Sequence, residues 1–236
     1  MNDLNRKRAG LIASLRGQGI TDERVLSAMD AVPREEFVPV SLRARAYEES
    51  ALPIGLGQTI SLPFVVAYMC QELKIEDGMS VFEVGTGCGY HASVLSKLAR
   101  RVYTLERHKP LLKETLERLE ALRIRNVTAM AADGTRGWPL ERTPFDRIIL
   151  TASPDDRPPQ ALFDQLAVGG MMLAPVGAQG QSQKLRRYTK GENNLITTED
   201  LIDVRFVPLL PEMSDDDYNP NAIDGSHAIG SVGGAS

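Results

Sequence analysis

The chain has 236 residues, of which 42% are apolar and 25% charged. This composition is typical of a globular domain with a sizeable core, and it excludes collagen-like, low-complexity and disulfide-scaffold chains. The net charge is −4, and the five carboxylates of residues 212–236, a stretch without Lys or Arg, contribute −5, which leaves residues 1–211 at +1. The rest of the chain is near neutral and lacks a basic footprint, so we expect no nucleic-acid partner.

Residues 1–45 predict short helices. The apolar run at 9–15 follows three basic residues but is only seven residues long, with no small-x-small cleavage site after it, so it favours an amphipathic helix over a signal peptide. Thr21 or Asp22 can cap a second helix. Residues 46–62 show no periodicity and contain one proline and two glycines, which predicts a long loop.

A third helix is predicted to start at Ser61, whose hydroxyl can cap it, with Pro63 inside its first turn. From Ser80 onward, β-type runs alternate with helical patterns, as in βαβ units. The runs are residues 80–84, 101–106, 126–131, 146–151 and 171–176. Helices are expected after the first run, from Pro110, and over Phe163, Leu166 and Val168.

Two later runs, 184–189 and 201–209, have no convincing helix between them and predict an antiparallel edge. The expected fold class is therefore α/β, a Rossmann-like, mostly parallel doubly wound sheet with an antiparallel edge and an N-terminal helical addition. We expect one domain in three parts: N-terminal helices and a covering loop at 1–62, the core at 63–211, and a disordered acidic tail at 212–236.

The two cysteines, Cys70 and Cys88, cannot form a disulfide framework and do not form a CxxC pair. Free thiols in a reducing compartment are the simplest interpretation. No run approaches the roughly 18–20 apolar residues that span a membrane. We expect a cytoplasmic protein without a membrane partner, acting as a monomer.

A glycine-rich turn, Gly85-Thr86-Gly87-Cys88-Gly89, lies between the first predicted strand of the sheet and a helix. An open α/β sheet binds nucleotides at this position. Tyr90 stands where a dinucleotide fingerprint requires another glycine or alanine, and no Gly-Lys-Ser/Thr occurs, so neither NAD nor a phosphate-cradling loop fits. A tight strand–helix turn without a ligand remains the alternative for the loop alone.

Two acidic residues favour an adenosine ligand. Glu106 ends the second strand, where a carboxylate can accept both ribose hydroxyls, and Asp133-Gly134 follows the third, where a carboxylate can meet an adenine amino group. A cationic ligand without a pyrophosphate suits this acidic cleft, which predicts S-adenosyl-L-methionine. Glu83 either contacts the methionine end of that cofactor or belongs only to the sheet.

The chain resembles the protein-L-isoaspartate O-methyltransferase family over roughly residues 18 to 210. The resemblance rests on residues 52–63 (LPIGLGQTISLP), 31–39 (AVPREEFVP), 46–48 (AYE), 83–90 (EVGTGCGY) and 204–209 (VRFVPL). The first of these strings is the most specific, because it lies outside the motif that unrelated methyltransferases share. Leu62 replaces a common Gln, and Cys88 a common Ser. The acidic tail lies beyond the family core.

This resemblance implies an S-adenosylmethionine-dependent enzyme of the EC 2.1.1.77 type. It would methylate the free carboxylate of L-isoaspartyl residues, with D-aspartyl residues as a second candidate substrate, in damaged proteins and peptides and so begin their repair through a succinimide. The resemblance assigns Ser61 to the substrate carboxylate and implies catalytic roles for Thr59 and Ser61, with Ile60 and Ser61 binding substrate. The implied cofactor-binding residues are Glu83, Gly85, Thr86, Gly87, Gly89, Glu106, Arg107, Asp133 and Gly134.

The chemistry needs little acid–base machinery, because a carboxylate is already ionised near pH 7 and needs no general base. We therefore expect no catalytic triad and no metal. His91, His108 and His227 are interpreted as structural or solvated. From residue physics alone, Ser61 is equally a helix cap; the family string favours the substrate role.

Three other functions compete with this one. A related enzyme could methylate Asp of a dedicated peptide or a small-molecule carboxylate, although such relatives carry longer C-terminal extensions. A cofactor-sensing module without turnover conflicts with the intact Gln58–Ser61 string, and an NAD-dependent dehydrogenase fails at Tyr90.

Overall fold

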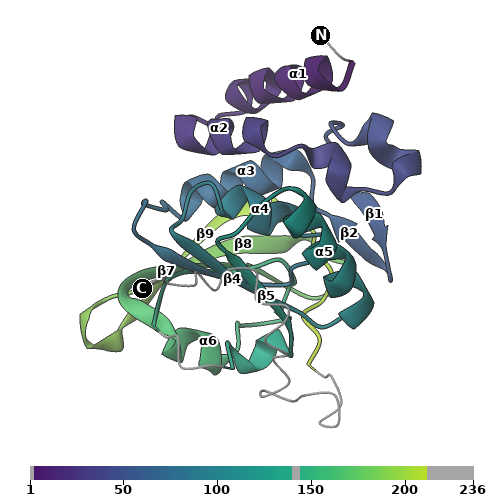
Figure 1. Ribbon diagram of the computed structural model, residues 1–236. Helices are drawn as coiled ribbons and strands as arrows, with labels where there is room; N and C mark the ends of the chain where they lie inside the picture. The colour runs from purple at the N-terminus through teal and green to yellow at the C-terminus, as the bar shows by residue number, and fades with distance from the viewer. Residues whose placement is uncertain (1–2, 140–143, 212–236) are drawn as a thin grey trace, which may run out of the picture.

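The computed structural model describes residues 3–139 and 144–211, so the expectation of a disordered tail lies outside the described residues. The chain begins with α1 (Asp3–Gly17) and α2 (Glu23–Ala31), followed by two short 3₁₀ helices, η1 (Arg34–Phe37) and η2 (Val40–Arg45). The Asp22 side chain accepts hydrogen bonds from the first turn of α2, which confirms it as the predicted cap. These N-terminal helices form an upper layer over α3 (Figure 1).

The predicted loop at 46–62 contains an antiparallel hairpin, which the sequence analysis missed. Its strands are β1 (Leu52–Gly55) and β2 (Gln58–Ile60), and Gly55 pairs with Gln58 across the turn. Both turn residues have positive φ, +52° at Leu56 and +72° at Gly57. Positive φ at both positions closes a tight two-residue hairpin turn, and leucine is an unusual residue there, which explains why the pattern did not predict a hairpin.

The helix predicted after Ser61 is α3 (Pro63–Glu72), with proline in its first turn as expected. Its N-cap is Leu62, and no side chain caps the helix. The prediction that Ser61 caps it is therefore wrong: Ser61 lies one residue too early for its hydroxyl to take that position. Val66 and Met69 lie on the buried face of α3.

The main sheet has seven strands in the order β5-β4-β3-β6-β7-β8-β9. The first five strands in this order, β5-β4-β3-β6-β7, pair in parallel, and β8 and β9 pair antiparallel at one edge. This arrangement confirms the predicted fold class. The strand bounds are β3 (Ser80–Val84), β4 (Arg101–Glu106), β5 (Val127–Ala131), β6 (Phe145–Leu150), β7 (Leu166–Val176), β8 (Gln183–Lys190) and β9 (Ile196–Val204).

Helices cover both faces of this sheet (Figure 1). The connecting elements are α4 (Tyr90–Leu95), α5 (Lys109–Ala121), η3 (Gly134–Arg136), α6 (Gln160–Asp164) and η4 (Glu192–Asn194). One buried hydrophobic cluster packs the five helices α1 through α5 against one face of the sheet. A second cluster, around Phe82, Trp138 and Phe145, packs α6 against the other face. Trp138 packs edge-on against Phe82.

Two boundaries differ from the predictions. Leu166 and Val168 were assigned to a helix, but β7 already starts at Leu166. A register shift interrupts the β6–β7 pairing near this start, and Gly169 has a positive φ of +77°. The predicted run 201–209 is displaced too: β9 ends at Val204, and the following segment pairs only through an isolated bridge between Ser153 and Pro208.

Candidate active site

The glycine-rich loop turns sharply between β3 and α4. Gly85 has φ +99°, and a Cβ there would lie 2.3 Å from Thr151 Oγ1, so only glycine fits. The same Thr151 hydroxyl donates to the carbonyl of Gly85 (2.6 Å), which ties the loop to the end of β6. Gly89 has φ +85°, and a Cβ there would lie 2.6 Å from the Thr115 methyl group of α5. The backbone of the loop is thus packed closely at both of these glycines.

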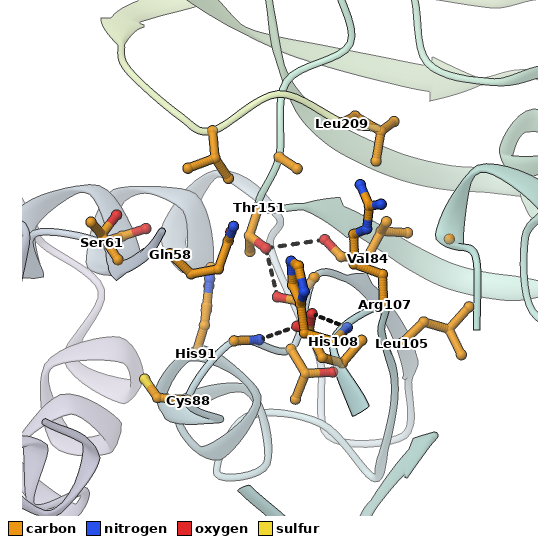
Figure 2. A pocket seen from close by; sticks show the side chains of 18 of the residues that line it. Gln58, Ser61, Val84, Cys88, His91, Leu105, Arg107, His108, Thr151 and Leu209 are labelled. Carbon is orange, nitrogen blue, oxygen red and sulfur yellow. Dashed lines mark hydrogen bonds between the residues drawn. The ribbon is translucent and has the colours of Figure 1, made fainter. Parts of the chain in front are cut away.

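Glu106 is placed as predicted, at the carboxyl end of β4 beside this loop. Its Oε2 accepts the Gly87 amide (2.8 Å) and its Oε1 accepts the His108 amide (2.9 Å), so both oxygens are oriented by backbone donors (Figure 2). The side chain is only 5% exposed, yet it lines the pocket described below. A carboxylate held in this way can still accept hydroxyl donors through its remaining lone pairs.

Glu83 lies on β3 behind the loop and does not line the pocket. It is fully buried, and its Oε2 accepts the Thr104 hydroxyl (2.6 Å), which in turn shares a hydrogen bond with the Thr86 hydroxyl (2.7 Å). Burial raises the pKa of Glu83 to about 8, while the Thr104 bond opposes this rise and the nearby charge of Glu106 adds to it. Near neutral pH, Glu83 is therefore predominantly protonated.

His91 packs against this buried acid. Its Nδ1 lies 3.9 Å from Glu83 Oε1, an oxygen without a hydrogen-bond partner in the part of the chain that the structure describes. Its Nε2 lies 3.5 Å from Cys70 Sγ. Burial lowers the pKa of His91 to about 3, so the ring is neutral at physiological pH. His91 also lines the pocket, a position that its interpretation as a structural residue did not anticipate.

Asp133 and Gly134 follow β5. Asp133 is buried and is the N-cap of η3. Its Oδ1 accepts hydrogen bonds from both the amide (2.8 Å) and the hydroxyl (2.7 Å) of Thr135. Among the described residues, Gly134 lines the pocket whereas Asp133 does not. A Cβ at Gly134 would lie 2.4 Å from Val84 Cγ1, so glycine is required here unless Val84 shifts. The contact of Asp133 with adenine stays a prediction.

The hairpin β1–β2 closes the site from the opposite side. Ser61 and Gln58 lie across the pocket from Arg107 and Leu209 (Figure 2). The Ser61 hydroxyl makes no hydrogen bond to any described residue; the bonds at this position involve its backbone carbonyl. A polar group without a protein partner on a pocket wall is available to a ligand.

Arg34 holds this wall from behind. The side chain is fully buried; its Nη2 donates to the Ser61 carbonyl and its Nε to the Ala46 carbonyl, each at 2.7 Å. The guanidinium also lies 4.7 Å from the ring centroid of Tyr90, the first residue of α4. One buried cation thus connects the hairpin with the helix that follows the glycine loop, and the sequence analysis did not single it out.

These elements enclose a cavity of about 430 Å³ at the carboxyl ends of β3, β4 and β6. Nine of the predicted site residues line it: Thr59, Ile60, Ser61, Gly85, Thr86, Gly87, Glu106, Arg107 and Gly134. The other three predicted residues, Glu83, Gly89 and Asp133, do not line it but are chain neighbours of residues that do. Groups of three or more metal-ligating side chains are absent from the described ranges.

Several lining residues were missed. Thr151 and Ala152 follow β6, which a parallel sheet brings to the same edge as Glu106, so their position in sequence was a usable signal. The segment 207–210 also lines the pocket and overlaps the quoted VRFVPL string. Gln179 lines it from the β7–β8 loop, and nothing in the sequence marks it.

A second cavity of about 450 Å³ adjoins the first and shares Thr59, Ser61, Thr151 and Val207 with it. The other residues that line it are largely apolar, and two of them, Asp203 and Arg205, are charged. The full set is Ala51, Leu62, Phe64, Val65, Ser182, Ile202, Asp203, Val204, Arg205 and Phe206.

Comparison with known proteins is consistent with this geometry. The profile of the protein-L-isoaspartate(D-aspartate) O-methyltransferase family matches residues 5–214. The chain is 51% identical to the protein-L-isoaspartate O-methyltransferase of Parvibaculum lavamentivorans (89% of this chain, 94% of that protein). It is 50% identical to that of Rhodospirillum centenum (88% and 93%).

Among solved structures, a Plasmodium falciparum protein described as a protein-L-isoaspartate O-methyltransferase, in complex with S-adenosyl-L-homocysteine, superimposes with a TM-score of 0.74 at 27% identity (86% of this chain, 98% of that chain). In the part of the chain that the structure describes, no helix combines the length and apolar character of a membrane span. The family profile and the relatives at half identity together assign this chain to the protein-L-isoaspartate(D-aspartate) O-methyltransferase family.

Proposed function

We propose that this chain performs the family's reaction with the residue roles that follow. The reaction moves the methyl group of S-adenosyl-L-methionine to the free carboxylate of an isoaspartyl residue in a damaged protein. A carboxylate oxygen attacks the methyl carbon, the carbon–sulfur bond breaks, and S-adenosyl-L-homocysteine leaves. An anion meets a sulfonium cation and both charges are neutralised, so the protein's task is to align the two groups and exclude water.

The cofactor would occupy the side of the cavity formed by the glycine loop. Glu106 would accept the ribose hydroxyls, because both of its oxygens are fixed by backbone amides and the side chain lines the pocket. Gly85, Thr86 and Gly87 would border the methionine portion, and Arg107 and Gly134 the adenosine. Asp133 and Glu83 would act from behind this wall, Asp133 toward the adenine amino group.

The substrate carboxylate would bind to the hairpin side, at Thr59, Ile60 and Ser61. The observation that carries this assignment is the Ser61 hydroxyl, which lies on the pocket, caps no helix, and has no partner among the described residues. Arg34 fixes the backbone of Ser61 and so limits where the hydroxyl can point. The start of α3 follows immediately, and free amides at a helix N-terminus also favour an anion.

The adjoining second cavity favours a peptide over a small-molecule carboxylate. It opens from the same Thr59 and Ser61, and its apolar walls, including Phe64 and Phe206, suit the side chain of a residue beside the isoaspartate. A free small acid would leave this cavity unused. Paired peptides with isoaspartate, L-aspartate or D-aspartate at one position, assayed with radiolabelled cofactor, test the assignment. Methylation of the isoaspartyl peptide alone, or with the D-aspartyl one, supports it; equal rates for L-aspartate contradict it.

We further infer that the enzyme acts as a monomer in the cytoplasm. Among the described residues, segments from both ends of the chain, the hairpin and residues 207–210, line the same pocket, and both cysteines are free and buried, which suits a reducing compartment. Light scattering of the purified chain with and without cofactor tests the first point. A stable dimer would contradict it.

A further inference from the structure

The second cavity begins where the proposed substrate site ends. Thr59 and Ser61 line both cavities, and Leu62, the next residue, lines only the second. Thr151 and Val207 are the other residues that the two cavities share. An isoaspartyl carboxylate held at Ser61 therefore has the second cavity directly beside it. The residues before and after the isoaspartate are covalently attached to it, so the side chain of one of these neighbours can enter this space.

Four large apolar side chains of this cavity keep part of their surface uncovered. Leu62, Phe64, Ile202 and Phe206 pack against the main hydrophobic cluster, and each stays partly exposed. They come from the start of α3 and from the end of β9 with the segment after it, and together they form one wall. Uncovered apolar surface that is gathered in one concave place is typical of a binding site for an apolar group.

The backbone behind this wall is held by specific contacts. The buried Gln183 side chain accepts a hydrogen bond from the Phe206 amide (2.7 Å) and donates one to the Phe206 carbonyl (3.2 Å). On the other side, the Phe64 ring lies 5.7 Å from the ring of Tyr68, four residues further along α3. The wall is thus formed before a ligand arrives, and binding to a preformed surface loses less conformational entropy.

The charged residues of the cavity do not favour a charged occupant. Asp203 and Arg205 are both exposed, and Asp203 already pairs with Lys184 (2.7 Å). An ion pair with an exposed arginine contributes little in water, whereas a charged group that moves against the apolar wall loses hydration. The cavity volume of about 450 Å³ leaves room for one large side chain. An uncharged, apolar side chain therefore matches the cavity best.

Leu62 extends the apolar surface up to Ser61. It is the N-cap of α3, and leucine is a poor residue at that position because it cannot accept hydrogen bonds from the first turn. Helix formation therefore does not account for a leucine here. The residue also stands where the family string commonly has Gln, whose amide would need hydrogen-bond partners on the same wall. Its place in the second cavity gives this leucine a role that neither helix nor family string requires.

We propose that Leu62 and the apolar wall of the second cavity form a specificity site for a residue next to the isoaspartate, so that this enzyme selects isoaspartyl residues with a large apolar neighbour. This inference rests on the proposed function and specifies its substrates. The neighbour's side chain lies away from the reacting atoms and is bound equally in the ground state and the transition state. Binding of this kind lowers KM and leaves kcat unchanged.

The test measures steady-state kinetics with radiolabelled cofactor on isoaspartyl peptides of one sequence. The residue before or after the isoaspartate is varied through Ala, Leu, Phe, Gln and Lys. At one of these two positions, we expect the KM for Leu and Phe to be about ten-fold lower than for Ala, at a kcat within about two-fold. Gln controls for size and Lys for charge, and neither should bind better than Ala. KM values that are equal across the series at both positions overturn the proposal.

Leu62→Gln tests whether this residue carries the preference, because glutamine is similar in size and is the common residue of the family string. The ratio of the KM for the Ala peptide to that for the Phe peptide should fall from about ten to about three, and Leu62→Met should keep it near ten. The matched control is Leu122→Gln, at a partly exposed leucine that packs on the same cluster but lines neither cavity, and it should also keep the ratio. A Leu62→Gln enzyme with the full ratio overturns the role of Leu62.

The outcomes separate this inference from the proposed function on which it rests. The Kd for S-adenosyl-L-homocysteine, measured for each variant, reports whether the cofactor side is intact. A wild-type preparation that methylates none of the isoaspartyl peptides contradicts the proposed function itself. A preparation that methylates all of them with the same KM leaves the proposed function standing and overturns the selection of apolar neighbours.

Discussion

Replacing Ser61 with alanine is expected to slow methyl transfer while leaving the fold and the cofactor affinity intact. In the structure the hydroxyl lies on the pocket wall and takes no part in capping α3, whose N-cap is Leu62. A hydroxyl bonded to an ionised carboxylate contributes about 1.5–3 kcal/mol, so kcat/KM for an isoaspartyl peptide should fall roughly 10- to 150-fold. The free energy of unfolding should change by less than about 0.5 kcal/mol, because no cap is lost.

The assay measures kcat/KM, the Kd for S-adenosyl-L-homocysteine by calorimetry, and urea unfolding on the same preparation. Ser27→Ala, on the exposed face of α2, is the matched control and should match the wild type in all three. A kcat/KM for Ser61→Ala within about two-fold of wild type would refute the substrate role. A loss of about 1 kcal/mol in stability, with the kinetics of the folded enzyme unchanged, would restore the capping interpretation.

Three further changes probe the cofactor side and its support. Gly85→Ala should weaken cofactor binding at least about ten-fold, because the added Cβ would collide with Thr151. The control is Gly19→Ala, at a glycine with a similar φ of +97° but open space around it, which should bind the cofactor normally; equal affinities of the two variants in calorimetry would contradict this. Arg34→Lys keeps the buried charge but cannot hold the carbonyls of both Ala46 and Ser61. The kcat should therefore fall about ten-fold at an unchanged cofactor Kd, and an unchanged kcat would refute the positioning role. The free energy of unfolding of the wild type, measured with urea, should fall between pH 6.5 and 8, and Glu83→Gln should remove most of this fall. If the free energies of wild type and variant change with pH in parallel, a neutral Glu83 is contradicted.

The direction of the pH effect predicted for Glu83→Gln follows from the pKa shifts of two buried groups, Glu83 and His91. The pKa of Glu83 is raised from 4.5 to about 8, so the native state holds a proton that the unfolded state releases, and stability falls as pH rises through that window. The pKa of His91 is lowered from 6.5 to about 3, so the unfolded state binds the extra proton, and stability rises with pH over that range. Above pH 6.5 only the Glu83 effect remains, on the order of 1–2 kcal/mol by pH 8.

The parallel core was predictable because burial on both faces leaves a local signature. The runs 80–84 and 101–106 coincide with β3 and β4, since each is a short segment rich in apolar and β-branched residues and bounded by turn residues. The position of Glu106 on the cavity could be predicted for the same reason, because the carboxyl end of a parallel strand beside a glycine loop can be inferred from strand order alone. Its contact with the ribose stays a prediction.

The misses share a different cause, because they depend on contacts distant in sequence or on backbone conformation. The hairpin requires Leu56 at positive φ, which leucine rarely adopts. Arg34 becomes a buried support only when the carbonyls of Ala46 and Ser61, 12 and 27 residues away, converge on it. No local periodicity reports either event, and a lone arginine is more often a solvated surface residue.

The buried acid behind the glycine loop bears on how the pocket accepts two opposite charges. The cofactor's sulfonium favours negative charge on the walls, whereas the substrate carboxylate is repelled by it. Glu106 lines the cavity, but burial keeps Glu83 protonated near neutral pH, so this side of the wall does not present two adjacent charged carboxylates. If Glu83 were ionised as well, the cofactor would gain attraction at the expense of the anionic substrate. A neutral Glu83 thus leaves the charges of the two reactants to neutralise each other in the proposed reaction.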